Sequence, residues 1–91
     1  MKAWEWLEQH EWVQGKAFKL VKCEIVGGCI LGALNEVRKE SMSQYDACAN
    51  RIDQVLKKRG MAGAFMPTID WNDAPGRTKE EVIALLKELD I

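Results

Sequence analysis

The densest group of chemically active side chains lies between positions 70 and 77, where Asp70, Asn72, Asp73 and Arg77 occur together. Two neighbouring carboxylates can act as a general acid and a general base when their surroundings differ. With Arg77 and His10, the only histidine, Asp70 and Asp73 would suit a small hydrolase or a nucleotide-handling enzyme. The charge of Arg77 nearby favours two ionised carboxylates instead. The other functional interpretation is a recognition surface that presents Asn72, Asp73 and Arg77 on a rigid loop.

The same stretch also has a structural interpretation, which we favour. Thr78 and Glu81 have the spacing of a capping box, in which each side chain bonds the backbone N–H of the other residue. Pro75 and Gly76 form a turn, because proline fixes φ and glycine tolerates a positive φ. We expect Trp71 to be half inserted in the core with its N–H hydrogen-bonded. The turn would then hold the last helix on the domain.

The sequence contains no pattern for a metal, a cofactor or a nucleophilic centre. Zinc sites need cysteine pairs two to four residues apart, and the three cysteines are far more widely spaced. A calcium loop beginning at Asp70 fails at Ala74 and Pro75, where a ligand and a glycine are needed. Neither glycine-rich phosphate-binding pattern is present. We therefore predict no cofactor, no metal and no catalytic residue.

Composition points to one soluble domain spanning residues 1–91. Apolar residues at 47% and charged residues at 30% are ordinary for a globular chain and exclude a disordered one. A net charge of −1 gives the chain no overall electrostatic attraction to nucleic acid or to an anionic membrane, so we do not expect nucleic acid as its partner. No apolar run approaches the roughly 20 residues of a membrane span. The start lacks a signal-peptide centre, and the odd number of cysteines suits a reducing, cytoplasmic setting.

Hydrophobic periodicity predicts a mainly α fold, a compact bundle of about four helices with a short extended segment and one long ordered loop. The apolar stripes recur at helical spacing. They place the helices over about the first ten residues and over residues 29–39, 41–59 and 79–89, and Ser41 and Ser43 both offer a cap for the third of these helices. The long loop is 60–77.

Two details of this prediction depend on single residues. Residues 16–26 alternate between apolar and charged types, which suits one short strand. We do not expect a hairpin, because no turn-forming residue occurs between Lys19 and Lys22. Gly32 lies inside a predicted helix at a cost of about 1 kcal/mol relative to alanine. It therefore indicates close approach by another backbone or by the Trp71 ring.

The long loop is unusually apolar, and this property suggests a binding role. Phe65 and Met66 are adaptable contact residues in a segment that must lie across the core or be covered by a partner. Trp4 lies off the apolar stripe of the first helix, so it either widens the buried face or lies at an interface. A homodimer burying Trp4, Trp6 and residues 18–26 is a further possibility.

Three motifs carry a resemblance to a known family. They are Trp71-Asn72-Asp73-x-Pro75-Gly76-Arg77-Thr78, Trp12-x-Gln14-Gly15 and Cys29-Ile30-Leu31-Gly32-Ala33-Leu34. In this order they resemble a family of small bacterial and phage proteins of unknown function, which implies one domain and no particular activity. The chain departs from the family pattern at residues 18–26 and 60–67.

These observations together predict a non-enzymatic protein-interaction module. Because the resemblance points to bacterial and phage proteins, we extend this prediction to a phage-encoded factor that binds a bacterial host protein. Its partner is a protein or a second copy of the chain, with Asn72, Asp73, Arg77, Phe65, Met66 and Trp4 as candidate contact residues.

Overall fold

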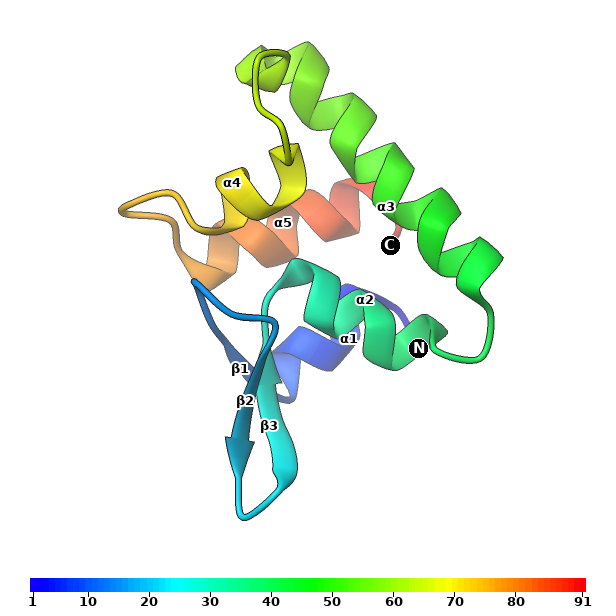
Figure 1. Cartoon of the computed structure of the whole chain (residues 1–91), viewed down its shortest axis with the longest axis vertical. Helices are drawn as coiled ribbons and strands as arrows, with labels where there is room; N and C mark the ends of the chain where they lie inside the picture. The colour runs from blue at the N-terminus through cyan, green and yellow to red at the C-terminus, as the bar shows by residue number, and fades with distance from the viewer.

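A computed structural model describes the whole chain, Met1–Ile91 (Figure 1). It contains five α-helices, one π-helical turn and a three-stranded mixed sheet. In chain order the elements are α1 (Ala3–Glu8), β1 (Glu11–Trp12), β2 (Phe18–Val21), β3 (Glu24–Gly28), α2 (Ile30–Arg38), α3 (Met42–Leu56), η1 (Lys57–Met61), α4 (Pro67–Asn72) and α5 (Lys79–Leu89). The fold is therefore α plus β, and the prediction of a mainly α bundle of about four helices is wrong.

The sheet has the strand order β1-β3-β2. β1 runs parallel to β3, and β2 pairs antiparallel with β3 as a hairpin that projects from the helices (Figure 1). The two hairpin strands are joined by Lys22 and Cys23, which have φ angles of 51° and 67°. A two-residue loop with both φ angles positive matches the right-handed twist of paired strands. Such loops usually contain asparagine or glycine, and neither is present here, so the sequence did not indicate this turn.

The core lies between α1, α2, α3 and α5, and Ile25 of β3 packs against its edge. Helix α1 contacts α2 and α5, and α2 contacts α3. The apolar side chains that fill this space are spaced three or four residues apart within each helix, as expected for amphipathic helices. The largest fully buried ones are Leu7, Ile30, Leu34, Ile52, Leu56, Val82, Leu86 and Ile91.

Two helix starts have the caps that local sequence predicts. The Ser41 hydroxyl accepts a hydrogen bond from the backbone N–H of Gln44 at the start of α3. At α5 the reciprocal bonds between Thr78 and Glu81 form the predicted capping box, and this helix spans the predicted residues. No helix of the fold has both the length and the apolar character needed to cross a lipid bilayer.

Gly32 allows the β1–β2 connection to lie against α2. A methyl group on Gly32 would overlap the carbonyl oxygen of Ala17 and come within 3.2 Å of the Phe18 ring. The close approach predicted at Gly32 is therefore made by a backbone, and the Trp71 ring is not among the nearest atoms.

The predicted long loop contains α4, which was not expected. Pro67 opens this helix at a position where its missing N–H costs nothing. The carboxylate of Asp53 on α3 accepts hydrogen bonds from the N–H of Thr68 at 3.2 Å and from its hydroxyl at 2.5 Å. The bond pair fixes the start of α4 on α3 and places Met66 and Phe65 just outside this junction.

Candidate functional site

Two segments that are distant in the sequence meet around the buried side chain of Asn72, which is 1% exposed. Its Oδ1 accepts hydrogen bonds from Trp12 Nε1 at 2.8 Å and from the backbone N–H of Ile30 at 3.1 Å. Its amide nitrogen donates to the carbonyl oxygen of Val13 at 3.1 Å. One amide thus joins β1, the start of α2 and the end of α4. We call residues 12–15 and 71–74 the clasp.

The outer part of the clasp is also closed by internal hydrogen bonds. Asp73 Oδ1 accepts from the backbone N–H of Gly15 and from the Asn72 amide, each at 2.9 Å. Gln14 Nε2 donates to the carbonyl oxygens of Asn72 at 3.0 Å and Ala74 at 2.9 Å. Two of the three motifs noted in the sequence are therefore hydrogen-bonded to each other. The third motif begins at Cys29 and joins them through Ile30, whose backbone N–H donates a hydrogen bond to Asn72.

Arg77 is bound to the segments on either side of it. Its Nε donates to the Trp71 carbonyl at 3.0 Å, and the guanidinium lies 3.9 Å from the centre of the half-buried Trp71 ring. Its Nη1 pairs with Glu81 Oε2 at 3.0 Å. The pKa of Glu81 is held below its ordinary value by the backbone N–H and hydroxyl of Thr78, with Arg77 adding in the same direction. Pro75 and Gly76 form the connecting turn, and Gly76 has a φ of 81°.

The residues of the alternative enzyme are not gathered in one pocket. Asp73 lines a cavity beside Cys29, whereas Arg77 lines a separate hollow with Trp71 and Glu81. His10 stacks on Trp6 at 3.9 Å, and its Nδ1 hydrogen-bonds the Trp6 carbonyl at 2.7 Å. No group of three His, Cys, Asp or Glu side chains is placed to hold a metal ion.

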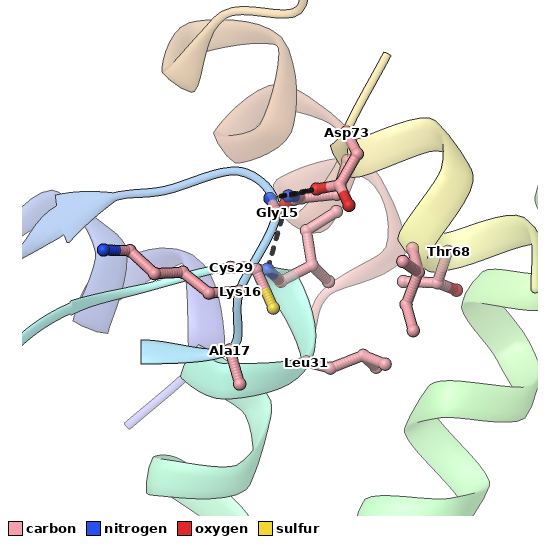
Figure 2. Close-up of a pocket in the computed structure, with 10 residues that line it drawn as sticks. Gly15, Lys16, Ala17, Cys29, Leu31, Thr68 and Asp73 are labelled. Atoms are coloured by element: carbon pink, nitrogen blue, oxygen red, sulfur yellow. Dashed lines mark hydrogen bonds between the residues drawn. The ribbon is translucent and has the colours of Figure 1, made fainter. Parts of the chain in front are cut away.

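The cavity beneath the clasp has a volume of about 260 Å³ (Figure 2). Its walls come from the β1–β2 connection, the start of α2 and one face of α4. In Figure 2 the ammonium end of Lys16 points away from Cys29, Leu31 and Thr68. The Cys29 sulfur accepts from the Gly32 N–H at 3.4 Å, and the Thr68 hydroxyl donates to Asp53. These two polar groups thus have partners within the chain.

A second hollow of about 140 Å³ adjoins this cavity and shares Leu31, Thr68 and Ile69 with it. Its other walls are the outward face of α3 and the two residues before α4. These residues are Tyr45, Ala49, Asp53, Phe65 and Met66. We call the cavity and this hollow together the groove.

The candidate contact residues fall in different places. Phe65 is 97% exposed and Met66 is 47% exposed, both at the groove. Trp4 lies half-buried on α1 with the ammonium of Lys87 4.8 Å from its ring centre. Asn72, Asp73 and Arg77 belong to the clasp and its flank. Sequence reasoning missed Trp12 and Gln14 as clasp residues, although the Trp12-x-Gln14-Gly15 motif itself marked them.

Comparison with known proteins shows the family. No curated protein and no solved structure matches the chain. Residues 1–89 match the sequence model of the family described as "Family of unknown function (DUF6197)", which covers nearly the full length. The chain therefore belongs to this family of unknown function.

Proposed function

We propose that the chain is a non-enzymatic protein-interaction module that binds its partner at the groove. The observation that carries this proposal is the Phe65 side chain, which is 97% exposed at the edge of an apolar hollow. Met66 beside it is 47% exposed, and Leu31, Tyr45 and Ile69 form the floor.

Burial energetics support a partner at this place. Covering a phenylalanine side chain stabilises a complex by about 1.5–3 kcal/mol, and the exposed ring contributes nothing to the fold. Aromatic and methionine side chains are the types enriched at the centres of protein interfaces. Methionine also adapts its shape to different partners.

The clasp supports a binding role over the alternative hydrolase. Asp73 and Arg77 make bonds that hold turns together, to Gly15 and to the Trp71 carbonyl respectively. A general acid or base must instead reach a substrate proton within hydrogen-bond distance. The resemblance to bacterial and phage proteins suggests a phage-encoded factor acting in the bacterial cytoplasm, where its partner would be a host protein.

Affinity capture from a bacterial lysate tests this proposal. The bait proteins are the wild type, Phe65→Ser and the control Leu20→Ser, whose side chain is also well exposed (61%) but lies on β2. We expect at least one protein to be enriched by the wild type and by Leu20→Ser and to be lost with Phe65→Ser. Size-exclusion chromatography of the same three proteins measures self-association. If neither capture nor self-association depends on Phe65, the proposal is wrong.

A further inference from the structure

We propose that the groove binds an amphipathic helical segment of a protein that combines apolar side chains with lysine or arginine, an inference that rests on the proposed function. The occupant of the groove is then a basic segment of a partner protein. An acidic or neutral segment and a second copy of the chain are the outcomes that would contradict it.

The apolar part of this recognition follows from the shape of the groove. Two hollows of about 260 and 140 Å³ lie side by side and share the wall formed by Leu31, Thr68 and Ile69. Two adjoining apolar hollows suit two neighbouring apolar side chains of one segment, which is how amphipathic helices lie in hydrophobic grooves.

The basic part follows from the acidic residues around the groove. Asp53 lines one hollow and Asp73 lines the other. Asp46 follows Tyr45 on α3, Asp70 follows Ile69 on α4, and both are exposed. The chain has six ion pairs, whose acidic members are Glu8, Glu11, Glu36, Glu81, Glu88 and Asp90. None of these four aspartates takes part in an ion pair within the chain. Asp53 and Asp73 line the groove, and Asp46 and Asp70 each follow a lining residue in the chain, at its rim.

No cation of the chain compensates these carboxylates inside the groove. Lys16 is the one basic residue among its walls, and its ammonium points away from the other labelled wall residues in Figure 2. The Tyr45 hydroxyl, at the same groove, also lies close to acidic side chains. Burial raises its pKa above the ordinary value, and the charges of Cys29 and Asp46 add in the same direction.

The hollow on the far side of α4 offers the contrast. It is lined by Trp71, Arg77 and Glu81, together with Arg59 and Glu88. There each arginine is paired with a glutamate, Arg77 with Glu81 and Arg59 with Glu88. Of these two hollows, the one beyond α4 has its charges paired within the chain, whereas the lining aspartates of the groove have no cationic partner and can attract a basic segment.

Fluorescence anisotropy with two labelled peptides tests this inference. The first peptide combines leucine and lysine in helical spacing, and the second has glutamate in place of every lysine. We expect the wild type to bind the lysine peptide at least about tenfold more tightly. Asp46→Lys with Asp70→Lys should remove about tenfold of that preference, because each rim charge contributes a modest amount and both are reversed.

A matched double variant separates the groove from the net charge. Glu24→Lys with Glu80→Lys makes the same change in net charge at two exposed acids that neither line the groove nor adjoin a lining residue in the chain. Glu80 also lies in a helix first turn, as Asp70 does, so each double variant removes one acid from a helix first turn. The control should keep the lysine preference within about threefold of the wild type.

The outcomes separate this inference from the proposed function. Equal binding of the two peptides, or an equal loss of lysine preference in the two double variants, would overturn the proposal of a basic segment. If capture still depended on Phe65, the proposed interaction module would be retained. Absence of both peptide binding and Phe65-dependent capture would overturn both. A Phe65-dependent dimer that neither peptide dissociates would make a second copy the occupant and overturn the basic segment alone.

Discussion

The clasp is closed by hydrogen bonds within the chain, whereas the groove leaves apolar side chains exposed. In the clasp, Asn72 and Asp73 bond to residues about sixty positions away along the chain, and the Asn72 amide is buried. In the groove, Phe65 is almost fully exposed and Met66 is half exposed, although the two lining aspartates, Asp53 and Asp73, accept hydrogen bonds within the chain. The comparison shows that the polar side chains of residues 72–77 mainly form hydrogen bonds that stabilise the fold. The surface available to a partner is formed mainly by apolar side chains, such as Phe65 and Met66.

The largest effect should come from removing the centre of the clasp. Asn72→Ala leaves the Trp12 N–H, the Ile30 N–H and the Val13 carbonyl without their partner. A buried polar group without a partner costs about 1–3 kcal/mol, so we expect a loss of about 3 kcal/mol or more in the free energy of unfolding. Urea denaturation measures it. The exposed Asn50→Ala on α3 is the control and should change stability by less than about 0.5 kcal/mol. A loss below about 1 kcal/mol for Asn72→Ala would show that the clasp does not hold the fold.

A smaller loss should follow from adding one methyl group at Gly32. The new Cβ would overlap the Ala17 carbonyl, a backbone atom that cannot rotate away. Overpacking costs about 1–3 kcal/mol, partly offset by the better helix propensity of alanine. We expect a net loss of about 1–2 kcal/mol in the free energy of unfolding. Gly63→Ala is the control, since a Cβ there meets no atom within 4 Å. If the two variants were equally stable, the β1–β2 connection would not be held against α2.

Acidification should sharpen the comparison on the α5 side of the clasp. The folded-state pKa of Glu81 lies below its ordinary value of 4.5, chiefly because Thr78 donates to its carboxylate. A lowered folded-state pKa gives stability that is present above the unfolded value and lost as the pH falls through the folded value. The stability difference between the wild type and Glu81→Gln should therefore shrink below about pH 4.5. Denaturation at pH 7 and at pH 3 measures it, and an equal difference at both pH values would contradict the role of the capping box.

Local sequence predicted those parts of the fold that neighbouring residues decide. The span of α5, its capping box and the Ser41 cap each depend on residues within one or two turns. The hairpin was missed because Lys22 and Cys23 adopt positive φ angles without the usual turn residues. Helix α4 was missed because its six residues are too few for a periodic pattern, and part of its support comes from Asp53, fifteen positions earlier.

The candidate site was predictable only in part, for the same reason. Phe65 and Met66 stood out because they are apolar residues in a predicted loop. Tyr45 belongs to an apolar helical stripe that predicts core, and Leu31 lies outside the stripe predicted for its helix; only the packing of α2, α3 and α4 shows that the two residues form a groove floor. The internal use of Asn72 required knowing that residues 12–15 lie beside it.

The smallest change in stability should come from Phe65→Ser, which nevertheless tests the comparison most directly. A side chain that is 97% exposed loses almost no buried area on truncation, so the free energy of unfolding should change by less than about 0.5 kcal/mol. The same substitution should weaken binding at the groove by about tenfold or more, because truncating an aromatic interface anchor often costs more than about 1 kcal/mol. Denaturation and anisotropy with the leucine–lysine peptide measure the two quantities on one protein sample. A large stability loss would place Phe65 with the clasp as part of the scaffold. Unchanged binding would remove the groove as the contact surface, whereas loss of binding without loss of stability is what distinguishes a surface kept for a partner from one kept for the fold.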